Sequence, residues 1–324
     1  MYSLPELQTI VSEKIEALRF DKPPQELYEP IRYSLSTGGK RIRPTLVLAG
    51  CDLFGGDVSR AVQVALAFEI LHNFTLLHDD IMDDSPIRRN QPTVHCKWDS
   101  NTALLSGDAM MITAYGFLKK LPPKQLRLIF PLFNNTALEI CEGQQYDLNF
   151  SSQDDVSEAR YMEMIRLKTS VLLAACLKAG ALLGDASPED ADLLYDFGLN
   201  IGIAFQLRDD LLDVYANEAE FGKRTGNDIL TGKKTFLLIR ALQQSEKKDR
   251  DMLLHLLKDK EIADKEKIAR VTEIYNRLQI RDITEERIDL YHRRAVSSME
   301  KVTVAKSRKQ TLLTFSNQLK HRSK

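Results

Sequence analysis

Two stretches, ILHNFTLLHDDIMD at residues 70–83 and IGIAFQLRDDLLD at residues 201–213, carry most of the information in this chain. Each is a largely apolar run that ends in the pattern DDxxD, and the two patterns begin 130 residues apart, at Asp79 and Asp209. In a helix, residues i and i+4 share one face, so the first and last aspartates of each pattern point the same way. The sequence therefore predicts two helices that each present carboxylates at the rim of an apolar core.

These carboxylates indicate a bound cation. Two acidic clusters at a core rim repel one another unless a cation lies between them. Oxygen ligands without Cys or His favour Mg²⁺, which binds through a few carboxylates and the phosphates of a substrate. A single DDxxD is weak support, because three fixed Asp positions arise by chance in about one chain in ten or twenty of this length. A single copy is ordinarily a solvated helix face or helix end, whereas two copies in matched settings predict a magnesium site for a phosphorylated substrate.

The rest of the chain also has a helical pattern. Ser3 and Glu6 have capping-box spacing, and apolar residues follow at helical intervals through Leu18, until a proline pair at 23–24. A second start signal begins at Ser187-Pro188, and no proline occurs after it. Alternating β-branched runs are scarce, so no strand is predicted. We expect one all-α domain over residues 1–324, with a turn at the proline pair 122–123.

Two regions near the C-terminus have distinct compositions. Residues 243–310 mix charged residues with Leu and Ile, which is typical of amphipathic surface helices. The tail 320–324 is basic and is expected to be frayed.

Composition limits the classes of protein that fit. The 324 residues are 43% hydrophobic and 28% charged, as in ordinary globular proteins, and the net charge of −1 gives no support for nucleic-acid binding. The longest apolar stretch, Val171 to Leu183, contains Lys178 and is too short to span a bilayer. The four widely spaced cysteines are interpreted as reduced core thiols: Cys51, Cys96, Cys141 and Cys176. We therefore expect a cytoplasmic protein without a stable membrane span.

Further short segments surround the two aspartate patterns. Arg88 and Arg89 follow the first pattern and could each grip phosphate oxygens. Upstream, GGKRIRP at residues 38–44 places three cations behind a flexible glycine pair; on its own it is a basic turn before a helix. The pairs Gly143-Gln144 and Lys168-Thr169, and the segment GKRTGNDILTGKKT at residues 222–235, would each be unremarkable alone.

Together these segments resemble the trans-isoprenyl diphosphate synthases, or polyprenyl synthetases. The resemblance runs from about residue 30 to 240 and covers six motifs in the family's order, ending with FQLRDDLLD and the lysine-rich segment after it. It implies an antiparallel helix bundle around a deep central cavity, with the two aspartate motifs facing each other across its mouth. It also implies a homodimer and three Mg²⁺ ions per active site. Asn90 stands where the family usually has glycine, and Asn tolerates the left-handed conformation that such a turn needs.

The resemblance also implies a role for each matching residue. The Mg²⁺ ions would be held, directly or through water, by Asp79, Asp80, Asp83, Asp209, Asp210 and Asp213, assisted by Asp147 and Asp228. The allylic diphosphate would be bound by Arg88, Lys168, Lys223 and Lys233. Isopentenyl diphosphate would be bound by Lys40, Arg43, His72 and Arg89. Gln144 is a further substrate-binding candidate, and Gln206 and Thr169 would turn oxygens toward the developing carbocation.

The reaction implied by the resemblance is head-to-tail prenyl transfer, in which isopentenyl diphosphate is added to dimethylallyl, geranyl or farnesyl diphosphate. Product length would be set at Phe74 and Thr75, five and four residues before Asp79. An aromatic residue at the first of these positions with an uninterrupted DDxxD resembles short-chain geranylgeranyl synthases. We therefore expect a C20 product, with a C15 farnesyl product as the alternative; an ordinary core role for Phe74 is the simpler interpretation.

Two other classes remain open. A terpene cyclase shares the helical fold and one DDxxD, but its second metal motif mixes Asn or Asp with Ser or Thr and Glu. A silent regulatory subunit usually lacks one aspartate motif, and this chain has both. The histidines His78 and His95 form no metal-ligand pattern with the cysteines, so hydrogen-bonded structural roles are expected for them.

Overall fold

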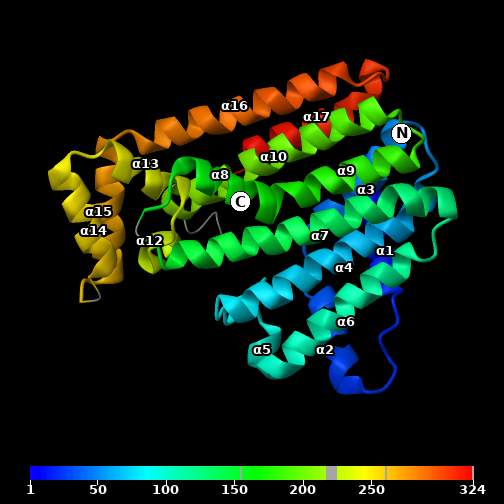
Figure 1. The fold of residues 1–324 in the computed structure, drawn as a ribbon, viewed down its shortest axis with the longest axis horizontal. Coiled ribbons are helices and arrows are strands. Elements are labelled where there is room, and N and C mark those ends of the chain that lie inside the picture. Colours follow the sequence, from blue (N-terminus) through cyan, green and yellow to red (C-terminus); the bar gives the residue numbers. More distant parts are fainter. Residues whose placement is uncertain (154, 217–224, 260, 323–324) are drawn as a thin grey trace. The chain divides into compact units, whose positions relative to one another are not determined.

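The computed structural model describes residues 1–324 except 154, 217–224, 260 and 323–324. These residues divide into two compact units. The first comprises residues 1–138, 172–195 and 301–311, and the second comprises residues 139–171, 196–300 and 312–324. Both units are almost entirely helical, which confirms the predicted all-α class (Figure 1). The expectation of a single domain stays a prediction.

The first unit is built around one long helix that carries the first aspartate motif. Its main elements are α1 (Leu4–Glu16), α2 (Gln25–Ser36), α3 (Ile42–Leu53), α4 (Val58–Met82), α5 (Val94–Lys97), α6 (Ser100–Leu118) and the start of α7 (Pro123–Ser151). Helix α4 is apolar on all sides along much of its length, as expected of a core helix, and α6 packs beside it (Figure 1). The motif therefore lies where the buried helix emerges, as its sequence predicts.

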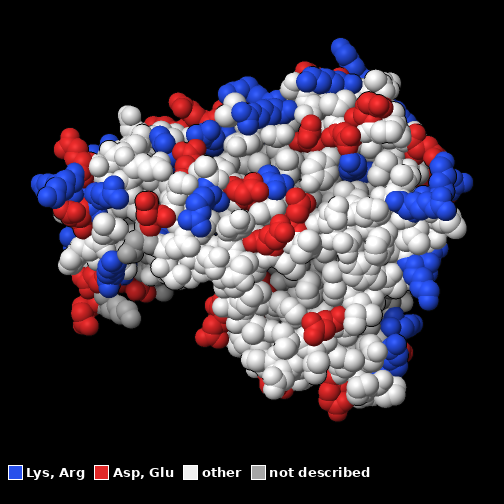
Figure 2. Space-filling view, viewed as in Figure 1, with Lys and Arg blue, Asp and Glu red and all other residues white. Residues whose placement is uncertain are grey.

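One face of α6 is exposed and apolar. Leu104, Leu105 and Ile112 are 49%, 59% and 72% exposed. The surface over α6 carries few charged side chains (Figure 2).

The helix starts follow the sequence signals closely. Ser3 and Glu6 form the complete capping box, although α1 ends at Glu16 and so stops before Leu18. Ser187 caps α10 (Pro188–Tyr215) by accepting a hydrogen bond from the amide of Asp190 at 3.0 Å. The proline pair at 122–123 separates α6 from α7, as predicted.

A two-stranded hairpin follows the first aspartate motif, where no strand was predicted. Strands β1 (Ile87–Arg88) and β2 (Gln91–Pro92) are antiparallel, and the turn residues Arg89 and Asn90 have φ values of 53° and 62°. Asn90 is left-handed, as expected, and two positive φ values suit a tight hairpin turn. Strands of two residues are too short to show alternation, which explains why the sequence pattern missed them.

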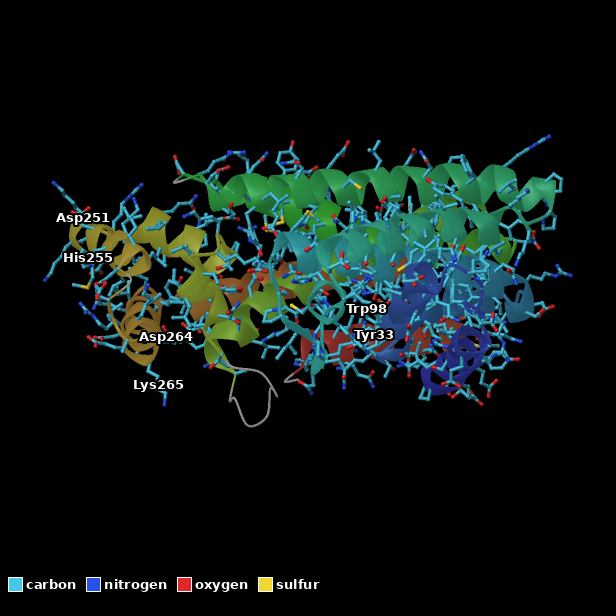
Figure 3. All side chains as sticks on the ribbon, turned by 90° about the horizontal axis from the view of Figure 1, so that it is seen from below. Tyr33, Trp98, Asp251, His255, Asp264 and Lys265 are labelled. Carbon is cyan, nitrogen blue, oxygen red and sulfur yellow. The ribbon has the colours of Figure 1, made fainter. Side chains whose placement is uncertain are left out.

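An aromatic cluster braces this hairpin. The Tyr33 hydroxyl donates to the carbonyl of Pro92 at 2.8 Å, and its ring lies 5.3 Å from that of Trp98 (Figure 3). The Lys97 ammonium lies 3.8 Å from the centre of the Tyr33 ring. These contacts join α2 to the segment after the hairpin and help to fix the two arginines that the hairpin carries.

The second unit carries the second aspartate motif on α10. Its other elements include the end of α7, α8 (Glu158–Ile165), the π-helical turn η1 (Arg166–Ser170), α12 (Asn227–Thr231), α13 (Phe236–Gln244), α14 (Lys247–Lys258), α15 (Asp264–Arg277) and α16 (Ile280–Lys301). Helices α14 to α16 bury apolar residues such as Leu253 and Ile288 and expose many charged ones, among them Asp251 and Lys265 (Figure 3). The amphipathic helices predicted for residues 243–310 are therefore confirmed.

Two details correct the sequence expectations. Cys51 and Cys176 are buried thiols, but Cys96 and Cys141 are exposed, so only two of the four are core residues. The basic tail is not wholly frayed, because α17 (Lys306–Lys320) extends to its start and Arg322 makes an ion pair. The described residues contain no helix that is both long and apolar enough to cross a membrane.

Candidate active site

In the first aspartate motif, the middle carboxylate is held inward. Asp80 is 5% exposed and accepts hydrogen bonds from Arg88 Nε at 2.7 and 2.9 Å, while Arg88 Nη2 lies 2.6 Å from Asp80 Oδ1. Arg88 Nη2 also lies 3.7 Å from Asp79 Oδ2. Burial raises the pKa of Asp80, and the hydrogen bonds from Arg88 oppose that rise. The hairpin thus brings a predicted diphosphate-binding arginine to two predicted metal ligands.

The predicted isopentenyl-binding residues are also brought together, within the first unit. Arg43 Nη1 lies 3.0 Å from His72 Nε2. Burial, followed by the charge of Arg43, lowers the pKa of His72 well below its usual value, so the neutral ring accepts a hydrogen bond from the guanidinium.

The glycine pair allows Arg89 to approach the same segment. Arg89 Nη1 donates to the carbonyl of Gly38, and a Cβ on Gly39 would lie 2.7 Å from the guanidinium carbon. Gly39 also has a φ of +121°, which side chains rarely adopt.

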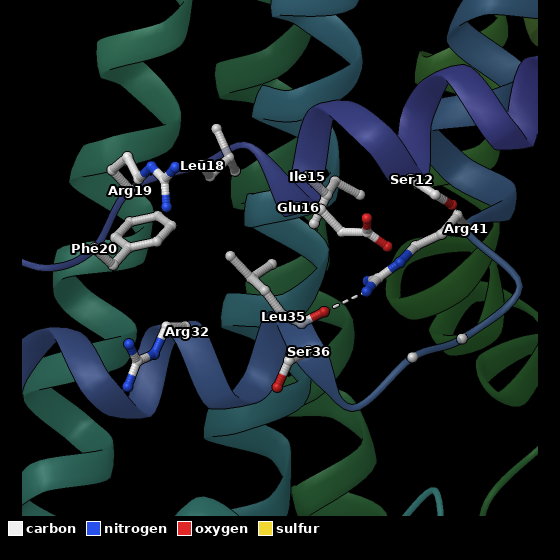
Figure 4. Close-up of a pocket in the computed structure, with 12 residues that line it drawn as sticks. Ser12, Ile15, Glu16, Leu18, Arg19, Phe20, Arg32, Leu35, Ser36 and Arg41 are labelled. Atoms are coloured by element: carbon white, nitrogen blue, oxygen red, sulfur yellow. Dashed lines mark hydrogen bonds between the residues drawn. The ribbon is translucent and has the colours of Figure 1, made fainter.

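The third cation of GGKRIRP has a different environment. Arg41 Nη1 lies 2.6 Å from Glu69 Oε1, and its Nη2 donates to the carbonyl of Leu35 (Figure 4). Arg41 also borders a pocket of about 410 Å³ between α1, α2 and the glycine pair. Arg41 is therefore a buried structural cation. Its neighbour Arg43 instead contacts His72, one of the side chains predicted to bind isopentenyl diphosphate.

The predicted chain-length residues lie one turn before the motif, on α4. The ring of Phe74 packs edge-on against that of His78, with centroids 4.7 Å apart. His78 Nε2 lies 3.1 Å from the carbonyl of Leu104, which confirms its hydrogen-bonded role. His95 differs: among the described residues neither ring nitrogen has a hydrogen-bond partner, and Asp84 Oδ1 lies 3.8 Å away. Thr75 donates its hydroxyl to the carbonyl of His72 at 2.8 Å.

The second motif repeats the inward arrangement of its middle carboxylate. Asp210 is 3% exposed; its Oδ2 accepts from the Tyr161 hydroxyl and its Oδ1 from Gln206 Nε2 at 3.1 Å. Gln206 Oε1 in turn accepts from Thr169 Oγ1 at 3.1 Å. Burial, and then the charge of Asp210, raises the pKa of Tyr161 well above its usual value, so its hydroxyl keeps its proton.

A carboxylate cluster lies beside it. Asp213 Oδ2 accepts from the amide of Asp228 at 2.9 Å. Burial raises the pKa of Asp210, Asp213 and Asp228, and the charge of Asp228 adds to the rise at the other two, while Lys233 opposes it. These oxygens are therefore under-compensated for negative charge, which is the condition that a divalent cation relieves. The predicted ligand Lys223 lies outside the described residues.

Asp209, the first residue of the second motif, pairs with the C-terminal segment. Arg322 Nη1 lies 2.8 Å from Asp209 Oδ1, and the guanidinium lies 5.3 Å from the centre of the Phe205 ring. Sequence reasoning missed this contact because nothing local links a basic tail to a distant aspartate.

The π-helical turn η1 presents the predicted Lys168 and Thr169, and two glycines make room for it. A Cβ on Gly143 of α7 would lie 2.3 Å from the Lys168 nitrogen, and one on Gly202 of α10 would lie 2.6 Å from Ser170 Cα. Lys168 Nζ lies 2.7 Å from Asp147 Oδ2. Turns of this kind occur often at functional sites. The GQ pair at residues 143–144 belongs to a sequence motif, whereas nothing in the local sequence marks Gly202 as a close-packing position.

Each unit therefore assembles its own set of polar side chains suited to diphosphate chemistry. Among the described residues, no three His, Cys, Asp or Glu side chains form a ready-made metal cage. Hard carboxylate oxygens near cationic side chains can hold a magnesium diphosphate and stabilise its departure as a leaving group.

Comparisons with known proteins show that this chain is a prenyltransferase. Residues 24–276 match the family described as Polyprenyl synthetase, and the chain belongs to that family. It is 43% identical over 228 residues to the geranylgeranyl diphosphate synthase of Methanosarcina mazei, covering 70% of each chain. It is 39% identical over 269 residues to a short chain isoprenyl diphosphate synthase of Methanothermobacter thermautotrophicus, covering 83% of this chain and 82% of the relative.

Solved structures agree. A crystal structure of a geranylgeranyl pyrophosphate synthase superimposes with a TM-score of 0.95 and 38% identity, over 99% of both chains. Among the sequence relatives, a geranylfarnesyl diphosphate synthase of Natronomonas pharaonis is 35% identical to this chain. The matched region covers 75% of this chain and 76% of that relative. The family is therefore established, and its members differ in product length.

Proposed function

We propose that this chain catalyses the Mg²⁺-dependent head-to-tail condensation of isopentenyl diphosphate with dimethylallyl, geranyl or farnesyl diphosphate to give C20 geranylgeranyl diphosphate. The observation that carries this proposal is the shared environment of the two motifs, each of which keeps one carboxylate buried and hydrogen-bonded beside further acidic and basic groups. Relatives named geranylgeranyl diphosphate synthase support the C20 product.

In this proposal the carboxylates of the two motifs would hold three Mg²⁺ ions, which would supply the charge neutralisation that makes the allylic diphosphate a better leaving group. Asp79, Asp83, Asp209 and Asp213 supply oxygens to them, directly or through water. Asp80 and Asp210 support the metal site from behind, because they are buried and both carboxylate oxygens of each already accept protein hydrogen bonds. Arg88, Lys168, Lys223 and Lys233 bind the diphosphate oxygens, and Asp147 and Asp228 hold neighbouring groups in place.

Isopentenyl diphosphate, the second substrate, binds at a separate set of basic side chains. Lys40, Arg43, His72 and Arg89 hold isopentenyl diphosphate, with Gln144 as a further contact. The neutral His72 ring beside Arg43 supports this role, because it orients the guanidinium without taking its charge. Gln206 and Thr169 turn oxygens toward the allylic carbon as its C–O bond breaks. The double bond of isopentenyl diphosphate then attacks that carbon, and a proton is lost to the released pyrophosphate.

Product length is set in this proposal by Phe74, with Thr75 beside it. Phe74 is held edge-on by His78, so its ring forms a firm floor for the growing chain. A C15 farnesyl product is the alternative, if the growing chain is stopped closer to the aspartate motif.

We propose a homodimer in which the exposed face of α6 is buried. Leu105 and Ile112 on α6, with Leu128 and Phe130 on α7, are large apolar side chains of the first unit that face solvent. The Ile112→Asp variant should sediment as a monomer, and a dimer in that variant would place the interface elsewhere. Free cysteine thiols support a reducing, cytoplasmic location.

The test of this function combines labelled isopentenyl diphosphate and Mg²⁺ with each allylic starter in turn, and sizes the dephosphorylated products. A discrete C20 alcohol that disappears with EDTA is expected. The Asp79→Ala and Asp209→Ala variants should lose several orders of magnitude in turnover, and near-wild-type rates would refute the metal assignment. Absence of elongation with every starter would contradict the function, and a cyclic hydrocarbon would indicate a cyclase.

A further inference from the structure

Tyr161, which belongs to none of the sequence motifs, begins a line of hydrogen bonds. Its ring is 2% exposed on α8, and its hydroxyl donates to Asp210 Oδ2. The line continues from Asp210 Oδ1 to Gln206 Nε2 at 3.1 Å, and from Gln206 Oε1 to Thr169 Oγ1 at 3.1 Å. Four side chains from α8, α10 and η1, all in the second unit, are thereby connected end to end.

The donor order along this line fixes the orientation of each group. Asp210 accepts from Tyr161 at one oxygen and from Gln206 Nε2 at the other, so Gln206 turns its NH₂ group toward Asp210 and its oxygen toward Thr169. Thr169 uses its one proton on Gln206, so the lone pairs of its hydroxyl oxygen stay available as acceptors. If the Asp210 carboxylate rotated, Gln206 and Thr169 would lose their fixed orientations. The Tyr161 hydroxyl opposes that rotation, because it is bonded to the carboxylate oxygen that Gln206 does not use.

We propose that Tyr161 is a positioning residue for prenyl transfer: it holds Asp210, and Asp210 fixes the orientations of Gln206 and Thr169. The inference rests on the proposed function, in which the oxygens of Gln206 and Thr169 face the charge that develops on the allylic carbon. Pre-oriented oxygens stabilise the transition state more than the bound substrate. Tyr161 therefore acts on kcat and leaves KM almost unchanged.

The first test is Tyr161→Phe, which removes one oxygen and keeps the buried ring. Loss of a partner behind a functional group typically costs about 10- to 100-fold, so kcat should fall by that factor while both KM values stay within about twofold. The matched control is Tyr215→Phe, which removes a hydroxyl bonded to Asn276 Oδ1 at 3.0 Å in the same unit. Its kcat should equal that of the wild type.

A double-mutant cycle tests whether Tyr161 acts through Gln206. If the line of hydrogen bonds is the route, Tyr161→Phe should cause no further loss of kcat in a Gln206→Ala background. A second readout needs no substrate: hydrogen exchange of the Gln206 side-chain amide, whose signal is identified by its loss in Gln206→Ala, should be faster in Tyr161→Phe.

The inference would be overturned by a kcat for Tyr161→Phe within twofold of wild type, by losses that multiply in the double variant, or by unchanged exchange of the Gln206 amide. Equal losses in Tyr161→Phe and Tyr215→Phe would also overturn it, because both would then reflect weakened structure. An inactive wild-type chain would refute the proposed function instead, while the exchange measurement would still test the hydrogen-bond line.

Discussion

Replacing Arg41 with alanine is expected to destabilise the folded chain by about 3–5 kcal/mol, because it breaks a buried ion pair and leaves one charge behind. The Arg41 and Glu69 side chains are 9% and 2% exposed, and their N and O atoms lie 2.6 Å apart. After the substitution, Glu69 would keep one side-chain donor, Asn73 Nδ2, at 3.0 Å. An exposed pair of the same length would contribute under about 1 kcal/mol, so burial decides the magnitude.

The assay is urea unfolding at equilibrium. With a slope of about 3 kcal/mol per molar urea, a loss of about 3–5 kcal/mol lowers the midpoint by about 1–1.7 M. The control is Arg32→Ala, whose side chain is 63% exposed and lies 3.8 Å from Glu29; it should lose less than about 1 kcal/mol. The double variant Arg41→Met with Glu69→Leu should recover most of the loss, since no buried charge remains.

A midpoint for Arg41→Ala equal to that of Arg32→Ala would refute the reasoning. The same variants separate structural from substrate-binding cations in GGKRIRP. At a temperature where Arg41→Ala stays folded, its KM for isopentenyl diphosphate should remain within about twofold of wild type. Arg43→Ala should raise that KM by at least about tenfold, since it removes a charge-assisted contact to phosphate.

The remaining predictions concern product length, protons and the C-terminal segment. Phe74→Ala should shift the sized products beyond C20, and an unchanged distribution would place the floor elsewhere. Burial raises the pKa of Asp210 and Asp213 in the metal-free folded chain, so these two groups contribute stability below the unfolded carboxyl pKa of about 4. That contribution is lost as pH rises through the pKa values of the folded state. Mg²⁺ competes with these protons, so it should raise Tm more at pH 8 than at pH 5.5; equal shifts would contradict this. Arg322→Ala frees Asp209 from a partly exposed pair worth up to about 1 kcal/mol, so calorimetry should find Mg²⁺ binding about two- to fivefold tighter, and weaker binding would reverse the argument.

Much of the fold could be predicted because its signals are local. The capping box at Ser3 and the start at Ser187 each lie at one helix end, and the amphipathic period after residue 243 recurs within each of several helices; the structure has all three. Differences occur where length or context outweighs pattern. The run beyond Glu16 has helical spacing but does not continue the helix, and the hairpin strands are too short to show a period.

The sequence by itself determined the helical class and the residues that can carry diphosphate chemistry, because apolar periodicity and DDxxD spacing act over a few neighbouring residues. Only the tertiary structure decided the partners of those residues. Tyr161 and Asp210 are 49 positions apart, and Arg322 and Asp209 are 113 apart. The role of Arg41 was also decided by the tertiary structure. In the sequence it is a cation like its neighbours, and only its burial against Glu69 shows that it is structural. Contacts at such separations depend on how helices pack, which local spacing does not encode.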